Sequence, residues 1–162
     1  MSESNSSAEA SPACAGEGEI AVRPGDRLPG LPAHHLKFNV DWRVTPAWAV
    51  GAQYRAYSHQ TVRGNENGAH TPDGAGFSGS GHLGGYALLD LTASWKPRRG
   101  LELFAKVANV FDRRYASAGQ LGRNGFDAAG AVLPPEAWRN EQFVAPGAPR
   151  AVWVGVRLQL GA

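Results

Sequence analysis

Apolar and polar residues alternate along five stretches of this sequence, and this alternation restricts the fold more than any other feature. In the first stretch, 35–44, every even-numbered residue is apolar and every odd-numbered residue is polar or charged. Successive side chains of a β-strand point to opposite sides, so the stretch predicts a strand with one apolar and one polar face. Similar stretches lie at about 48–56, 86–95, 101–107 and 151–160, with Leu88 as an exception. The pattern predicts an all-β fold, and no segment is convincingly helical.

The connections between these stretches are short, long, short and long in turn. Residues 45–47 and 96–100 form short turns, whereas polar, Gly-rich connections span about 58–84 and 110–149. Tilted strands of about nine or ten residues cross a bilayer. Bacterial outer-membrane barrels have short periplasmic turns and long external loops. We therefore expect an antiparallel up-and-down meander of about five strands, the C-terminal portion of a transmembrane β-barrel, with two irregular long connections.

Three tryptophans gather at one end of the expected strands. Trp42, Trp48 and Trp95 lie on the apolar face, each within about three residues of a short turn, and Tyr54 lies toward the opposite rim. Such amphipathic rings are favoured at the height of the lipid headgroups. Alternation alone favours a small soluble β-sandwich or β-barrel binding module. The gathered rings favour the membrane barrel, and we expect all four residues to mark its interfaces with water.

The opposite face of the expected strands is charged. Its charged residues are Lys37, Asp41, Arg43, Arg55, Asp90, Glu102, Lys106 and Arg157. In a wet barrel interior these side chains would pair across neighbouring strands. The solvent-facing surface of a soluble sheet would look much the same, so the charges alone leave both folds open.

Two segments resemble a known family, the TonB-dependent outer-membrane receptors. The stretch 101–115, LELFAKVANVFDRRY, resembles the segment that precedes the last long loop of these receptors. The stretch 146–160, PGAPRAVWVGVRLQL, resembles their final strand, and 28–36 is similar to the approach to an earlier strand. The residues that carry the resemblance are Asn109, Phe111, Asp112, Tyr115, Pro149, Arg150, Gly155 and Arg157.

The resemblance implies a function and a set of partners. Such receptors have a barrel of about 22 strands, a plug domain inside it and an N-terminal segment that binds TonB. They import scarce nutrients, such as ferric siderophores or cobalamin, through the cell outer membrane, without catalysis and without a cofactor. The implied partners are the remainder of the barrel, the plug, TonB, the barrel-assembly machinery and outer-membrane lipid. A porin-like passive channel is disfavoured only by the family-like motifs.

The resemblance also divides the chain. Residues 28–162 would be the C-terminal strands of the receptor barrel, and 1–27 a disordered segment or loop remnant. Met1–Ala10 is polar throughout, so we expect no signal peptide. We therefore expect the chain to be a fragment that does not function alone.

Other chemistry is sparse. The net charge of +2 is too small to indicate nucleic-acid binding. Cys14 is the only cysteine, so an intramolecular disulfide is impossible. The five histidines (His34, His35, His59, His70 and His82) fit no compact metal-ligand spacing, and no nucleophile motif is present. We expect no metal site and no catalytic residue.

Three residues of the second long connection are weak candidates for ligand binding. Arg113 and Arg114 would contact an anionic ligand, and Trp138 would contact the same ligand through its ring. A simpler interpretation pairs the two arginines with Asp112 or Asp127 and packs Trp138 within the loop.

Overall fold

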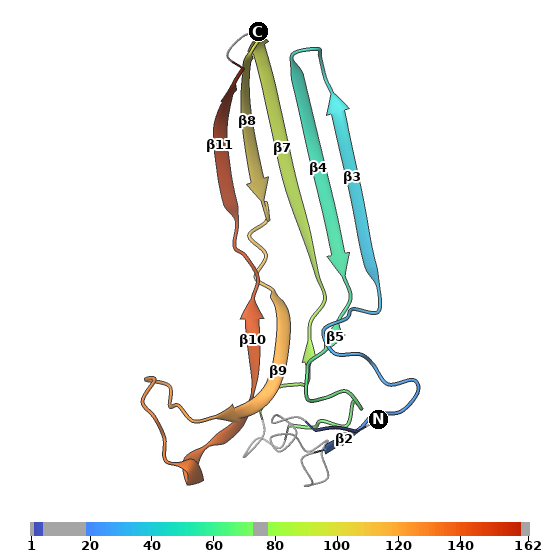
Figure 1. Cartoon of the computed structure of the whole chain (residues 1–162), viewed down its shortest axis with the longest axis vertical. Coiled ribbons are helices and arrows are strands. Elements are labelled where there is room, and N and C mark those ends of the chain that lie inside the picture. The colour runs from blue at the N-terminus through green and yellow to red at the C-terminus, as the bar shows by residue number, and fades with distance from the viewer. Residues whose placement is uncertain (1, 5–18, 73–77, 160–162) are drawn as a thin grey trace. The chain divides into compact units, whose positions relative to one another are not determined.

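The computed structural model describes residues 2–4, 19–72 and 78–159, which fall into two compact units (Figure 1). The sheet unit comprises 34–58, 85–115 and 147–162, and the loop unit comprises 1–33, 59–84 and 116–146. Most of the segment expected to be disordered, including Cys14, lies outside the described residues, so that expectation stays a prediction. None of the described residues belongs to a helix long and apolar enough to cross a membrane.

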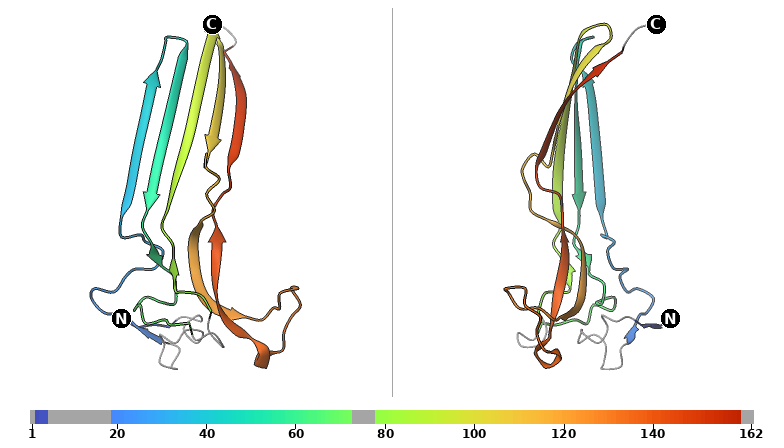
Figure 2. Two further views of the ribbon diagram at one scale, coloured as in Figure 1. Left: turned by 180° about the vertical axis from the view of Figure 1, so that it is seen from behind. Right: turned by 60° about the vertical axis from the view of Figure 1, so that its left-hand side comes forward.

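The sheet unit is one antiparallel sheet in the order β11-β8-β7-β4-β3, so each strand pairs with its neighbours along the chain within this unit. Its strands are β3 (His35–Arg43), β4 (Trp48–Tyr57), β7 (Tyr86–Arg98), β8 (Leu101–Ala108) and β11 (Ala151–Leu158). Figure 2 shows these five strands as a single twisted layer. The expected five-stranded meander is confirmed. The expected extension of the last strand to Leu160 lies outside the described residues.

The two short turns are held by local hydrogen bonds. The Thr45 hydroxyl accepts the N–H groups of Ala47 (3.2 Å) and Trp48 (3.0 Å), an arrangement that favours a tight turn. In the other turn Gly100 has a φ of 76°, which glycine adopts without strain. The pairing of β7 with β8 shifts between Trp95 and Arg98, so this hairpin contains a bulge.

The apolar face of the sheet is exposed, and nothing in the described part of the sheet unit packs against it. The side chains of Phe38 and Trp42 are 60% and 62% exposed, and Val154 is 80% exposed. The buried residues of this unit are Leu88, Asp90 and Asn109, of which two are polar. This distribution reverses that of a water-soluble domain, where apolar side chains are hidden and charged ones are almost never fully buried.

The loop unit contains regular structure that the alternation does not predict. Its elements are β1 (Ser2–Ser4), β2 (Glu19–Ala21), β5 (Gln60–Thr61), β6 (His82–Leu83), β9 (Ala116–Asn124), β10 (Arg139–Pro146) and the short 3₁₀ helix η3 (Pro135–Ala137). β9 and β10 form an antiparallel hairpin, as β5 and β6 do. The expectation of an irregular connection over 110–149 was therefore wrong for about half of its length, at β9, η3 and β10.

A small apolar core stabilises the loop unit. Val62, Leu83 and Leu121 are buried together, and Ala116 packs against them. The backbone of β9 also bonds to a preceding segment: Arg63 donates its N–H to Gly119 (3.0 Å), and the Arg63 carbonyl accepts the N–H of Leu121 (2.8 Å). These backbone bonds and the single Leu121 anchor explain how a strand rich in glycine and alanine forms without an alternating sequence.

Candidate functional site

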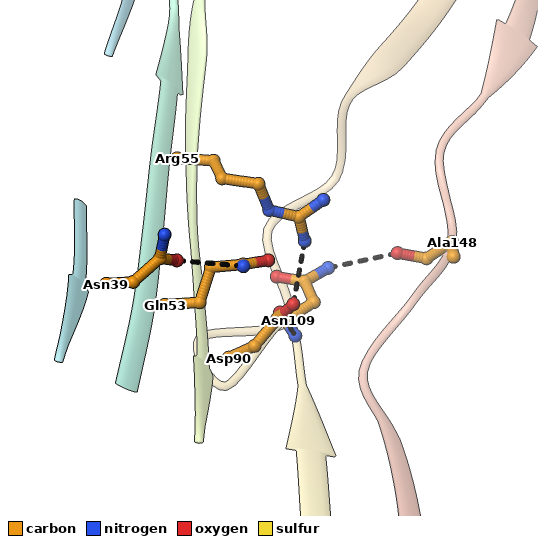
Figure 3. A network of polar contacts seen from close by, with 6 residues as sticks. All are labelled: Asn39, Gln53, Arg55, Asp90, Asn109 and Ala148. Carbon is orange, nitrogen blue, oxygen red and sulfur yellow. Dashed lines mark hydrogen bonds and ion pairs between the residues drawn. The ribbon is translucent and has the colours of Figure 1, made fainter. Parts of the chain in front are cut away.

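Asn109 is the centre of a polar network on the sheet unit (Figure 3). It follows β8, is buried, and has a φ of 50°, while Asp112 has a φ of 51°. Asparagine and aspartate are the non-glycine residues that most often adopt this left-handed conformation. The Asn109 carbonyl accepts the Asp112 N–H (2.8 Å), and its side-chain oxygen accepts the Arg113 N–H (2.9 Å). Two left-handed residues thus make a compact turn directly after the strand.

This turn is tied to the segment that leads into β11. The Asn109 side-chain amide donates to the carbonyls of Arg113 (3.0 Å) and Ala148 (3.1 Å). The Asp112 carboxylate accepts the Arg150 N–H at 2.9 Å. We call residues 109–115 and 147–150 the clasp, because they join the chain segments that lead to and from residues 116–146.

Tyr115 completes the clasp. Its carbonyl accepts the N–H of Gly147 (2.8 Å), and its ring lies so close to Gly147 that a side chain there would collide with it. Glycine in this position allows the ring to approach the backbone. The clasp contains six of the residues that carry the family resemblance: Asn109, Phe111, Asp112, Tyr115, Pro149 and Arg150.

Asp90 links the clasp to the polar face of the sheet. One carboxylate oxygen accepts the backbone N–H of Asn109 (2.9 Å), and the other binds the Arg55 guanidinium at 2.7 Å. On the neighbouring strands, Gln53 donates to Asn39 at 2.9 Å (Figure 3). The two bonds to the Asp90 carboxylate are charge-assisted, and such hydrogen bonds are stronger than neutral ones. Asp90 therefore positions both Arg55 and the start of the clasp.

The charged lattice expected on this face is present in part. Besides Arg55 and Asp90, the Arg157 guanidinium binds the Glu102 carboxylate at 2.8 Å and lies 5.9 Å from the Phe104 ring. The Phe104 ring covers Gly155, where a side chain would collide with it. The remaining expected members of the lattice form no ion pair within the part of the chain described; they are Lys37, Asp41, Arg43 and Lys106.

An aromatic row crosses the other end of the polar face. His35 stacks on Tyr57 with ring centroids 4.4 Å apart, Tyr57 meets Tyr86 at 4.9 Å, and Tyr86 meets Tyr115 at 4.3 Å. His35, Tyr57 and Tyr86 are register partners on adjacent strands, so their side chains share one face. Sequence reasoning missed this row because its members become neighbours only through the strand register.

The four aromatics expected at the membrane interfaces lie on the apolar face. Trp48 and Trp95 are register partners whose rings stack at 5.4 Å, and Trp42 lies near the same short turn. Tyr54 pairs with Phe38 and stands further along β4. Their role as interface markers stays a prediction.

The ligand-binding candidates lie in different units of the chain. Arg113 and Arg114 belong to the sheet unit, whereas Trp138 belongs to the loop unit. The Trp138 indole N–H donates to the Leu133 carbonyl (2.9 Å), and the Arg123 guanidinium lies 5.3 Å from its ring, so Trp138 packs its own loop. Their role in ligand binding stays a prediction.

The carboxylates expected to pair with the two arginines serve other groups. Asp112 accepts the Arg150 N–H, and the Asp127 carboxylate accepts the N–H groups of Ala129 (2.9 Å) and Ala131 (2.8 Å). The Asp127 carboxylate thus stabilises a local turn, whereas the Asp112 carboxylate joins the two segments of the clasp. The expected ion pairs do not form among the described residues. In the same part of the chain, no group of three His, Cys, Asp or Glu side chains converges as a metal site would require.

Comparison with known proteins decides the family. Residues 9–110 match the family described as TonB dependent receptor-like, beta-barrel. This chain belongs to the TonB-dependent receptors. The ferric enterobactin receptor of Pseudomonas aeruginosa PAO1 is 30% identical to it over 116 residues, which are 71% of this chain and 15% of that receptor. The receptor chain thus spans a small part of the length of its curated relative.

Solved receptor structures share the fold of this receptor chain. The ferric-catecholate import receptor Fiu of E. coli K12, in its closed form, matches with a TM-score of 0.54 and 19% identity over 81% of this chain and 15% of its own. The siderophore receptor PiuA of Acinetobacter baumannii matches with a TM-score of 0.55 and 13% identity over 80% of this chain and 14% of its own. The ferric yersiniabactin uptake receptor FyuA of Yersinia pestis matches with a TM-score of 0.51 and 19% identity over 85% of this chain and 18% of its own.

Proposed function

We propose that this chain supplies C-terminal wall strands to an outer-membrane receptor that imports a ferric siderophore. The exposed apolar face of the sheet carries this proposal, since side chains such as Val154, 80% exposed, need a lipid environment to be stable. The polar face, with its Arg55–Asp90 and Arg157–Glu102 pairs, is suited to the watery interior of a barrel. A soluble binding module would instead bury such an apolar face in its core.

Ferric siderophores are the favoured cargo, ahead of cobalamin. The curated relative is named for ferric enterobactin, and Fiu is described as a ferric-catecholate import receptor. Transport requires the remainder of the barrel, a plug domain and TonB, and assembly requires the barrel-assembly machinery and outer-membrane lipid. As part of a transport receptor, the chain would contribute a wall and loops.

The proposal has two tests. The genomic DNA upstream of the codon for Met1 should encode a plug domain and further alternating strands, in frame or after a frameshift; unrelated sequence there contradicts the receptor assignment. The full chain should partition with phospholipid vesicles and require detergent for extraction. A monodisperse, detergent-free monomer that melts cooperatively in buffer would instead establish the soluble module.

A further inference from the structure

A cavity of about 580 Å³ opens at the short-turn end of the sheet unit. The two short turns form part of its wall, and the facing ends of β8 and β11 form the rest. Four cationic side chains and one carboxylate line it: Lys96, Arg98, Arg99, Arg157 and Glu102. The formal charge of this lining is therefore four minus one, or +3.

Backbone hydrogen bonds fix the shape of this cavity. The Lys96 N–H donates to the Ala47 carbonyl at 2.8 Å, which ties the two short turns together. The Gln159 N–H donates to the Gly100 carbonyl at 2.8 Å, which ties the second turn to the end of β11. The backbone that holds the cationic residues is therefore fixed by hydrogen bonds to neighbouring segments.

The positive charge of the lining is uncompensated. Glu102 already binds Arg157 at 2.8 Å. Lys96, Arg98 and Arg99 are exposed and form no ion pair within the described residues. Three neighbouring cations without a counter-charge repel one another, so a bound anion would stabilise this end of the sheet.

The position of these cations indicates the source of the anion. The stacked Trp48 and Trp95 lie at the same end of the sheet on its apolar face, and such rings favour the height of the lipid headgroups. Arg98 is the register partner of Leu101 and therefore shares that apolar face. A guanidinium at this height meets phosphate oxygens, which it binds with paired hydrogen bonds.

We propose that Lys96, Arg98 and Arg99 bind the phosphate groups of anionic phospholipids in the leaflet that the short turns face. This inference rests on the membrane location proposed above. Arg157 supports the site by neutralising Glu102, which would otherwise repel the lipid phosphate. The anchored headgroup would fix the depth of the β3–β4 and β7–β8 hairpins in the bilayer.

The test uses the full chain reconstituted from detergent with two kinds of vesicle, pure phosphatidylcholine and phosphatidylcholine with 30 mol% phosphatidylglycerol. Flotation measures association with each. Association with the neutral vesicles reports the proposed membrane location, whereas the ratio between the two vesicle types reports the phosphate site. The two proposals therefore fail separately.

The triple variant Lys96→Gln, Arg98→Gln, Arg99→Gln should keep its association with neutral vesicles and lose most of the preference for anionic ones, on the order of 100-fold for three charges. The matched control Arg23→Gln, Arg27→Gln, Arg139→Gln removes the same charge from exposed positions of the loop unit and should keep the preference. The double variant Arg98→Lys, Arg99→Lys preserves charge and should keep most of it.

Several outcomes would overturn the inference. Equal binding of the triple variant and the native chain to anionic vesicles would exclude these residues. Equal losses in the triple variant and its control would mean unspecific charge attraction. Displacement of the native chain from anionic vesicles by 10 mM inorganic phosphate at constant ionic strength would indicate a site for free phosphate. If the native chain associates equally with both vesicle types, the site does not bind lipid phosphate, and an acidic protein segment becomes the expected ligand.

Discussion

The two units of this chain differ in whether they bury a cluster of apolar side chains. Both bury polar residues, such as Asn65 in the loop unit, but among the described residues of the sheet unit Leu88 is the only buried apolar side chain. In the loop unit, apolar Val62, Leu83 and Leu121 are buried together. In the sheet unit, polar Asp90 and Asn109 are buried while Val154 is 80% exposed. The proposed membrane location would account for this difference, since the loop unit would then meet water and the apolar face of the sheet unit would meet lipid.

This difference also changes what stabilises each unit. The loop unit depends on its small apolar core, as soluble domains do. The described residues of the sheet unit form no second layer, so the strand register, the Arg55–Asp90 pair and the clasp around Asn109 hold it together. Substitutions of the same chemical type should therefore have different effects in the two units.

The largest expected difference concerns two leucines. Leu121→Ala should destabilise the loop unit by about 4 kcal/mol, because Leu121 is 1% exposed and its removal leaves a cavity. Leu91→Ala in the sheet unit should cost below about 1 kcal/mol, because Leu91 is 40% exposed and lipid chains fill the vacated space. Urea unfolding in detergent micelles, with hydrogen exchange resolving the two units, measures both values. Equal costs would contradict the contrast between the units.

Asp90→Ala should be the next most damaging change. It leaves both the Arg55 guanidinium and the Asn109 N–H without their acceptor, and breaking a buried ion pair costs about 3–5 kcal/mol. Because the Arg55 side chain is 30% exposed, we expect the lower end of this range, measured as the free energy of unfolding in micelles. Asp90→Asn keeps one oxygen acceptor and is the matched control; an equal loss in both variants would show that the charge alone matters.

Asn109→Ala should cost about 2 kcal/mol. A non-glycine residue without a polar side chain is strained by about 1–2 kcal/mol in the left-handed conformation, and the hydrogen bonds to Arg113 and Ala148 are lost. Asn109→Gly tolerates the φ of 50° but loses the same side-chain bonds. Hydrogen exchange at the clasp should therefore rank the native chain above the glycine variant and the glycine variant above alanine. Equal protection in all three would show that the Asn109 side chain does not stabilise the clasp.

The smallest effect is expected at the exposed ion pair. The Arg157 side chain is 66% exposed, so water screens its attraction to Glu102 and Arg157→Gln should cost below about 1 kcal/mol. The same unfolding assay applies. A loss as large as that of Asp90→Ala would mean that this face is shielded from water, in conflict with a water-filled barrel interior.

The sheet unit could be predicted from its sequence because its strands have one apolar and one polar face, which gives each strand a two-residue period. Its five strands and two short turns follow from that period and from Pro46 and Gly100, but the second turn is shorter than predicted: residues 96–98, which include Pro97, belong to β7. The hairpin of β9 and β10 could not be predicted, since Gly119 and Gly122 interrupt one strand and Phe143 and Val144 are adjacent in the other. Its stability comes from distant backbone partners such as Arg63, which leave no local pattern.

The sequence identified residues of the candidate site but did not predict how they contact one another. The family resemblance identified Asn109, Asp112 and Tyr115, but their roles depend on two left-handed φ angles and on contacts with residues 147–150. An asparagine and an aspartate three residues apart at the end of a strand are a signal for such a turn. The aromatic row had no comparable signal, because Tyr57, Tyr86 and Tyr115 lie about 30 residues apart.

The orientation of the apolar face can be measured directly on β3. Single cysteines at 36–42, in a Cys14→Ser background, would carry nitroxide labels in lipid vesicles, and relaxation by oxygen and by a water-soluble nickel complex would be compared at each position. We predict oxygen access at 36, 38, 40 and 42 and nickel access at 37, 39 and 41. Labels with no two-residue period, or with even-numbered positions shielded from oxygen, would contradict a lipid-facing apolar side.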